Sequence, residues 1–266
     1  VYEDRKYTWS DIYKRVTKFA SALEKIGVSK GDTVSFLAFN TPEIFEAHYS
    51  VPMTGAVLNT INIRLDANTI SYILNHSDAK VLVVDRQLHL EVKKALSKLD
   101  KKIIIIDIND QFADQSKLEK IGELEYESFL KTGDDDYKWK MPDDEWQAIS
   151  LSYTSGTTGN PKGVVLSHGG ILANCEGAYD LLLPLIKKKN PVFLTWLPLS
   201  HSYEHTVQFV QILIGAEIFY AESLEKLLTN MSVAKPTIMT AVPRFYQNLY
   251  NKININFNNQ KGFKKK

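Results

Sequence analysis

Residues 151–170, LSYTSGTTGNPKGVVLSHGG, decide how the fold of this chain is interpreted. Two short apolar runs of strand type, residues 149–153 and 163–166, flank a segment of threonine, serine and glycine that closes on Lys162. Glycine lets a backbone approach an anion closely, hydroxyl groups donate hydrogen bonds, and lysine adds a mobile positive charge. The stretch therefore predicts two strands joined by a phosphate-binding loop, with an ordinary solvent-exposed hairpin turn as the alternative.

The loop differs from the Walker A phosphate-binding motif. Lys162 precedes Gly163, so a glycine stands where that motif has the hydroxyl residue that holds magnesium, and a strand is predicted on each side. The chain is therefore expected to hold phosphate by another device. The predicted phosphate ligands are Thr154, Ser155, Gly156, Thr157, Thr158, Gly159 and Lys162.

Residues 153–163, YTSGTTGNPKG, resemble the signature loop of the adenylate-forming superfamily, which includes acyl-CoA synthetases, luciferases and the adenylation domains of peptide synthetases. The resemblance implies that the loop holds the phosphates of ATP while a carboxylate attacks the α-phosphorus, giving acyl-adenylate and pyrophosphate. The thiol of CoA then displaces AMP. It also implies a catalytic role for Lys162 and a contact between Thr154 and Mg²⁺.

A second stretch, WLPLSHSYEH at residues 196–205, has three interpretations. His201, Glu204 and His205 form the pattern H-x-x-E-H, which on a helix places two imidazoles on one face and indicates a zinc peptidase. Pro198 suits the exit from a strand better than the middle of a zinc-binding helix, and no third ligand is evident. The histidines could also simply satisfy hydrogen bonds at the end of a strand.

The same stretch is similar to a Pro-x-x-His segment of long-chain acyl-CoA synthetases. This resemblance implies that His201 lies near the reacting carboxylate, as a catalytic and substrate-binding residue, and that Tyr203, Glu204 and His205 shape the acyl entrance. Residues 240–246, TAVPRFY, resemble the VPR segment of the same branch. Arg244 is left outside the catalytic set, because a salt bridge explains an arginine there equally well.

Strands and helices alternate along the chain. Continuous apolar strands are expected at 33–39, 55–60, 79–85 and 103–108, with helices between them, and such strands belong in a sheet covered on both faces. After the loop, strands are expected at 192–197, 217–220 and 237–242, again with intervening helices. The prediction is an α/β fold of two doubly wound halves, the large N-terminal domain of an adenylate-forming enzyme, incomplete at both ends.

The division expected is a first α/β subdomain at 1–108, a charged linker at 109–145, and a truncated second subdomain at 146–266 that carries the loop. Three consecutive aspartates, residues 134–136, lie in the linker. Adjacent carboxylates in a polar run are more typical of a solvated surface than of a metal site.

Composition limits the partners. The 266 residues carry 32 basic and 31 acidic groups, a net charge of +1, which gives no reason to expect nucleic acid. The single cysteine, Cys175, cannot form an internal disulfide and favours a cytoplasmic setting. No apolar run suggests an integral membrane segment, although peripheral contact stays open, and the oligomeric state is not indicated.

The sequence therefore predicts a fragment of an ATP-dependent ligase that converts a long-chain fatty acid to acyl-CoA, with ATP, Mg²⁺ and CoA. The adenine and ribose contacts and the catalytic lysine that the resemblance implies are not found in these residues, so the fragment alone is expected to be inactive. Two alternatives keep part of this function: an acyl-AMP ligase that delivers to a carrier protein, and a noncatalytic nucleotide-binding or acyl-binding module.

Overall fold

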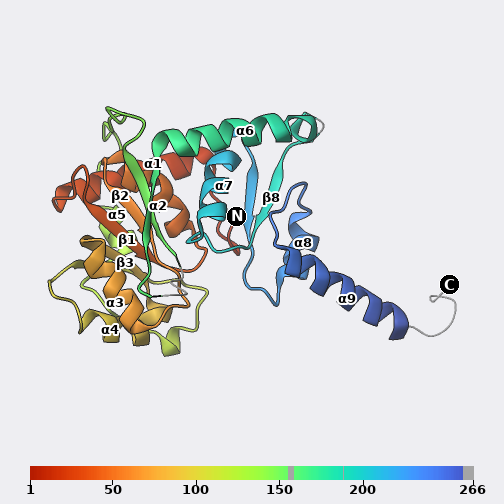
Figure 1. Cartoon of the computed structure of the whole chain (residues 1–266), viewed down its shortest axis with the longest axis horizontal. Helices are drawn as coiled ribbons and strands as arrows, with labels where there is room; N and C mark the ends of the chain where they lie inside the picture. Colours follow the sequence, from red (N-terminus) through yellow and green to blue (C-terminus); the bar gives the residue numbers. More distant parts are fainter. Residues whose placement is uncertain (155–158, 188, 260–266) are drawn as a thin grey trace.

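The computed structural model describes residues 1–154, 159–187 and 189–259. Its main element is a seven-stranded sheet in the order β5-β4-β3-β1-β2-β6-β7, and a smaller sheet pairs β8 with β9 (Figure 1). All neighbours are parallel except β6 and β7. The strands are β1 (Thr33–Leu37), β2 (Val57–Thr60), β3 (Ala79–Asp85), β4 (Ile104–Ile108), β5 (Leu124–Glu125), β6 (Ala148–Tyr153), β7 (Gly163–Ser167), β8 (Val192–Thr195) and β9 (Glu217–Tyr220).

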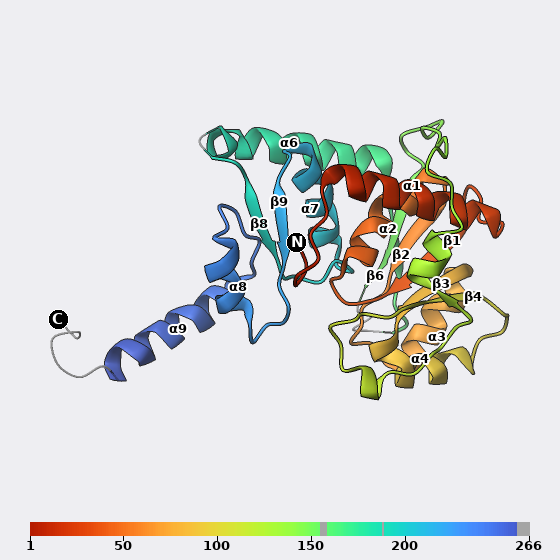
Figure 2. The ribbon, with the colours of Figure 1, turned by 180° about the vertical axis from the view of Figure 1, so that it is seen from behind.

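Helices cover the large sheet on both faces (Figure 2). The side chains of β3 alternate between two hydrophobic clusters: Val81 and Val83 join one cluster, and Leu82 and Val84 join the other. The first cluster contains residues of α1 (Trp9–Lys25), α2 (Pro42–Met53) and α5 (Tyr126–Leu130). The second contains residues of α3 (Ala67–His76) and α4 (His89–Leu96). The predicted α/β fold with a mainly parallel, doubly covered sheet is therefore confirmed.

Part of the stretch 109–145, which was predicted as a charged linker, belongs to this sheet. Strand β5 pairs with β4, and α5 places Tyr126, Phe129 and Leu130 in the core. The ring of Tyr126 stacks on Phe19 of α1 with centroids 4.6 Å apart. The aspartates behave as expected of a solvated surface: Asp134 and Asp135 form ion pairs with Lys25 and Lys18 of α1.

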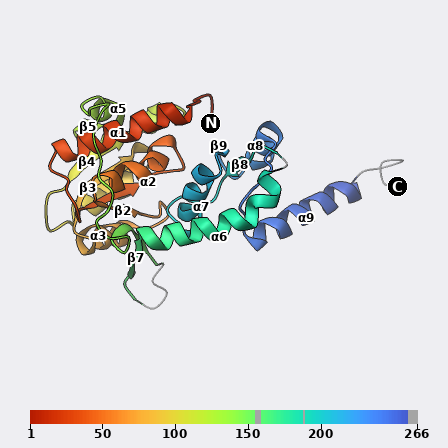
Figure 3. The same cartoon turned by 90° about the horizontal axis from the view of Figure 1, so that it is seen from above.

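The second half of the chain is built around the small sheet. Helix α6 (His168–Ile186) runs from the large sheet toward the small one, and α7 (Ser202–Leu213) lies beside it (Figure 3). Helices α8 (Leu227–Ala234) and α9 (Pro243–Asn259) follow, and α9 projects from the body of the molecule (Figure 1). None of the helices in the described residues is long and apolar enough to cross a bilayer.

The expected strand at 237–242 is wrong. Only Ile238 forms an isolated bridge, to Phe193 of β8, and the backbone N–H groups of Thr237 and Ile238 both donate to the Val192 carbonyl. Two donors on one acceptor cannot continue a regular ladder. The proposed three-part division of the chain stays a prediction, although β6 and β7 pair within the sheet of the first part.

Candidate functional site

The antiparallel pair β6–β7 forms two stems that end at the predicted phosphate loop. Tyr153, the last residue of β6, is paired with Gly163, the first of β7. Beyond this pair the backbone N–H of Thr154 donates to the Lys162 carbonyl at 3.0 Å, and the Lys162 N–H donates to Thr154 Oγ1 at 3.3 Å. The stems therefore bring Thr154 and Lys162 side by side, although they are eight positions apart in the sequence.

The chemistry of these two residues fits a phosphate and its metal ion. Both are exposed, so the Lys162 ammonium and the Thr154 hydroxyl are accessible from solvent. Gly159 has φ +151°, a backbone conformation that other residues rarely adopt, and a Cβ there would meet nothing within 4 Å. Ser155, Gly156, Thr157 and Thr158 lie outside the described residues, so their predicted contacts stay predictions.

His201 stands at the start of α7. It is the N-cap residue, and its Nδ1 accepts a hydrogen bond from the backbone N–H of Tyr203 at 3.4 Å. Its own backbone N–H donates to the Pro198 carbonyl, so the turn after β8 fixes the position of His201. The His201 and Tyr203 side chains are exposed, and Tyr203 lines the adjacent cleft.

Glu204 and His205, the other two residues predicted at the acyl entrance, are buried beneath the surface. Glu204 accepts hydrogen bonds from Thr240 Oγ1 at 2.7 Å and from Gln208 Nε2 at 3.2 Å. Burial raises the pKa of the Glu204 carboxyl to about 7. Its link to the cleft runs through Thr240, which lines the cleft wall. Direct substrate contact by Glu204 and His205 therefore stays a prediction.

The geometry does not support the zinc-peptidase interpretation. His201 caps the helix at the surface, whereas the His205 ring is buried against His48, with centroids 4.2 Å apart. In the described part of the chain, no three His, Cys, Asp or Glu side chains are close enough together to hold a metal ion.

A cleft of about 900 Å³ lies between α6, α7, β7 and the segment at 238–241. Its apolar walls come from Val165 and Leu166 of β7, Ile171 and Leu182 of α6, and Val207 and Val210 of α7. Strand β7 begins directly after Lys162 and α7 begins directly after His201, so elements that follow both predicted motifs line one cleft. Tyr203 is the predicted site residue, among those the structure describes, that lines it.

The wall contributed by α6 was not predicted as part of the site. Ile171, Asn174, Ala178 and Leu181 recur every three or four residues and line one face of the helix. That helical spacing was visible in the sequence, but the same pattern is typical of ordinary core. Only the position of α6 opposite α7 shows that this face borders a cleft.

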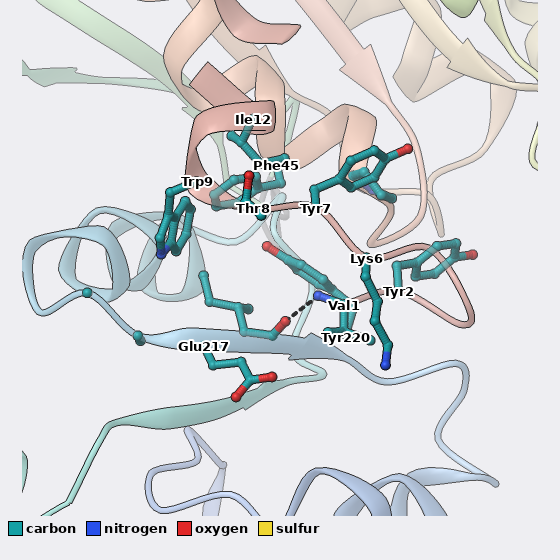
Figure 4. Close-up of a pocket in the computed structure, with 14 residues that line it drawn as sticks. Val1, Tyr2, Lys6, Tyr7, Thr8, Trp9, Ile12, Phe45, Glu217 and Tyr220 are labelled. Atoms are coloured by element: carbon teal, nitrogen blue, oxygen red, sulfur yellow. Dashed lines mark hydrogen bonds between the residues drawn. The ribbon is translucent and has the colours of Figure 1, made fainter. Parts of the chain in front are cut away.

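A second cavity, of about 440 Å³, lies apart from these residues (Figure 4). Trp9, Phe45 and Tyr220 line it, and the Val1 amino group donates to the Ile218 carbonyl at its edge at 2.6 Å. None of the predicted site residues borders this cavity. We therefore place the candidate site at the larger cleft, which is lined by Tyr203 and by Val165 and Leu166 of the strand that follows the loop.

Comparison with known proteins gives a consistent family. The sequence profile described as "AMP-binding enzyme" matches residues 1–265. An acetate–CoA ligase of Humulus lupulus is 46% identical over 215 residues, which are 76% of this chain and 37% of that protein. A peroxisomal trans-cinnamate:CoA ligase of Petunia hybrida is 35% identical over 262 residues, 92% of this chain and 45% of that protein.

The fold agrees with a solved structure. The luciferase-like enzyme of the mealworm Zophobas morio superposes with a TM-score of 0.77 at 20% identity, covering 93% of this chain and 56% of that one. This chain therefore spans less than half the length of the two ligases that it resembles in sequence.

Proposed function

Since the chain belongs to the AMP-binding enzyme family, we propose that it forms the phosphate-binding and acyl-binding part of an ATP-dependent acid–CoA ligase. The observation that carries the proposal is the hydrogen-bonded pair Thr154–Lys162 at the start of β7, a strand that continues into the wall of the cleft lined by Tyr203 of α7. This arrangement offers a cation and a hydroxyl for phosphate beside an apolar cleft for the rest of an acid.

In the proposed reaction a carboxylate oxygen attacks the α-phosphorus of ATP. A bond forms between that oxygen and phosphorus, the bond to the β-phosphate oxygen breaks, and pyrophosphate leaves. The CoA thiol then attacks the acyl carbon of the acyl-adenylate, forming a thioester and releasing AMP and a proton. Lys162 would hold the departing pyrophosphate, since its charge offsets the negative charge that accumulates there.

The other roles are part of the same proposal. Thr154 would offer its hydroxyl to Mg²⁺, and that ion would supply further stabilisation of phosphate charge. His201 would orient the substrate carboxylate from the head of α7, and Tyr203 would contact the acid as it enters the cleft. Glu204 would act on the cleft only through Thr240.

We propose a small carboxylic acid as the first candidate substrate. The support is the similarity to proteins named for acetate and cinnamate. A long-chain fatty acid, the substrate expected from the sequence motifs, is the second candidate, and the cleft of about 900 Å³ with apolar walls favours it. CoA is the proposed acceptor, with a carrier protein as the alternative acceptor.

The test is pyrophosphate exchange into ATP, measured on the complete gene product with Mg²⁺ and a panel from acetate to long-chain and aromatic acids. Exchange is expected only with an acid present, and Lys162→Ala should reduce it by about tenfold or more. His201→Ala should raise the KM for the acid more than that for ATP. Lys187→Ala is the matched control, because Lys187 is an exposed lysine at the end of α6.

Exchange that is absent with every acid, or equally strong in the wild type and Lys162→Ala, would remove adenylation from this site. Nucleotide binding without exchange would instead favour a noncatalytic binding module. A second assay with CoA or a carrier protein then identifies the acceptor.

A further inference from the structure

A hydrogen bond joins the phosphate-loop stem to a helix on the face of the large sheet. Tyr153 is the last residue of β6 and directly precedes Thr154. Its hydroxyl lies 2.8 Å from Nδ1 of His76, the last residue of α3. The two rings meet edge to face with centroids 5.8 Å apart. The contact thus ties the root of the loop to an element 77 residues earlier in the chain.

Tyr153 also contacts the second stem. It is paired with Gly163 across the β6–β7 ladder, and a Cβ built on Gly163 would lie 3.4 Å from the Tyr153 ring carbon Cζ and 3.0 Å from Leu151 Cδ1. The missing side chain at position 163 therefore leaves room for the tyrosine ring to pack across β7. One side chain touches both stems, one of which continues into Thr154 and the other into Lys162.

The position of the His76 ring is fixed by a neighbouring aromatic ring and by the packing of α3. Its ring stacks on Tyr72, one helical turn earlier, with centroids 5.3 Å apart and planes inclined by 25°. The neighbouring residues Ile73 and Leu74 are fully buried against the sheet. A histidine fixed by stacking, on a helix fixed by its core face, gives the tyrosine hydroxyl a defined partner.

The protonation of the tyrosine suits this contact. Burial raises the pKa of Tyr153 to about 12. The hydroxyl therefore keeps its proton at neutral pH and can donate it to Nδ1 in the tautomer that carries its hydrogen on Nε2.

We propose that His76 and Tyr153 are positioning residues that hold Thr154 and Lys162 in register for binding the pyrophosphate portion of ATP. This inference rests on the proposed function of the loop. The pair would act in the first half-reaction only, because the β- and γ-phosphates have left before CoA attacks.

The first set of variants separates the hydrogen bond from the packing. Tyr153→Phe keeps the ring over Gly163 and removes only the hydroxyl, and His76→Leu removes its partner. His76→Asn restores an acceptor, since the amide oxygen is two bonds from Cβ, as Nδ1 is. Tyr13→Phe is the matched control, because Tyr13 is an exposed tyrosine of α1.

The measurements use the complete gene product. Tyr153→Phe and His76→Leu should each raise the KM for MgATP in pyrophosphate exchange by about five- to tenfold, the effect of one lost hydrogen bond. The double variant should lose no more than either single one, because both remove the same bond. Thioester formation from supplied acyl-adenylate and CoA should be unchanged, and His76→Asn should recover most of the exchange.

A merely structural pair would behave differently. Equal loss of both half-reactions, additive losses in the double variant, or no change in the KM for MgATP would overturn the positioning role. Unaltered thioester formation also reports that each variant is folded.

Calorimetric binding of magnesium pyrophosphate distinguishes failure of this inference from failure of the proposed function. If the wild type binds pyrophosphate but does not exchange it, the proposed adenylation activity is rejected. Weaker pyrophosphate binding by both single variants would then still support the positioning role. If neither exchange nor pyrophosphate binding occurs in the wild type, both proposals fall. Unchanged pyrophosphate binding in the variants would overturn the positioning role alone.

Discussion

The imidazole rings of His48 and His205 face one another between α2 and α7, with centroids 4.2 Å apart. Both residues are buried, and Phe209 packs against the pair. His48 Nδ1 contacts the Ile44 carbonyl at 2.8 Å, whereas His48 Nε2 and both His205 nitrogens find no hydrogen-bond partner among the described residues. A second proton on either ring would thus place a charge in an apolar environment beside another imidazole.

The fold should therefore lose stability in acid. Burial lowers the pKa of His48 to about 4, and burial together with His48 lowers the pKa of His205. The unfolded chain, with histidine pKa near 6.5, binds protons that the folded chain excludes. The free energy of unfolding therefore keeps its full value above about pH 6.5, as far as these histidines are concerned. It decreases as the pH drops toward 4, by about 3 kcal/mol for His48.

Urea unfolding at several pH values between 4 and 8 measures this loss. Because carboxylates also titrate in acid, the informative quantity is the difference between the wild type and His48→Leu, whose stability should depend less on pH. Parallel pH profiles for the two proteins would contradict the assignment of this acid sensitivity to the pair.

Glu204 should change the pH dependence of stability in the opposite direction. Burial raises the pKa of its carboxyl to about 7, so the folded chain holds a proton that the unfolded chain releases near pH 4.5. Stability from this group is present at low pH and is lost as the pH rises toward 7. Glu204→Gln keeps an acceptor for Thr240 and should be more stable than the wild type at pH 8, by up to about 3 kcal/mol.

Thermal or urea unfolding at pH 5 and pH 8 checks the Glu204 prediction. Glu204→Gln should be more stable than the wild type at pH 8, and this difference in stability should be smaller at pH 5. Glu176→Gln, at an exposed position of α6, is the control and should change little at either pH. A Glu204→Gln protein that is less stable at pH 8 would show that the carboxylate is stabilised in the fold by its hydrogen bonds.

Arg15 is predicted to be essential for packing α1 against α2. Its Nε donates to Glu46 Oε1 at 2.5 Å and its Nη2 to Glu127 Oε1 at 2.6 Å, while the Tyr126 hydroxyl donates to Glu46 Oε2 at 2.8 Å. Glu46 is fully buried. Removing the cation should cost about 3–5 kcal/mol, because it leaves a buried carboxylate unpaired.

Urea unfolding of Arg15→Met tests this ion pair. Lys18→Met, which breaks an exposed pair with Asp135, should cost less than about 1 kcal/mol. Adding Glu46→Gln to Arg15→Met should recover part of the loss, since it removes the unpaired charge. A cost for Arg15→Met no larger than for Lys18→Met would contradict a charged, buried Glu46.

The sequence predicted the fold where local signals are strong. Strands 79–85 and 217–220 have the expected bounds. It failed at α5, whose five residues are too short to show a period, and at 237–242, where neighbouring strands decide the pairing. Both failures depend on tertiary contacts that no short window contains.

The candidate site also has features that the local sequence predicts and features that depend on long-range contacts. The proximity of Thr154 and Lys162 follows from a strand, loop and strand, which the sequence indicated. The pairs Glu204–Thr240 and His76–Tyr153 join residues 36 and 77 positions apart, so no local pattern predicts them. The exposed face of α6 became part of the site only through the placement of α7.

Thr154 gives the sharpest test of the proposed Mg²⁺ contact at the loop stem. Its Oγ1 accepts a hydrogen bond from the Lys162 N–H at 3.3 Å. The residue is exposed and directly follows the end of β6. Thr154→Val keeps the shape and removes the hydroxyl, so pyrophosphate exchange should fall by about tenfold or more and should need more Mg²⁺ for half-maximal rate. Thr154→Ser retains the hydroxyl and should keep most of the activity. Unfolding by urea should change by less than about 1 kcal/mol in both variants, because the residue is exposed. A Thr154→Val enzyme with the wild-type Mg²⁺ dependence would remove this hydroxyl from the metal site and leave Thr154 as part of the stem alone.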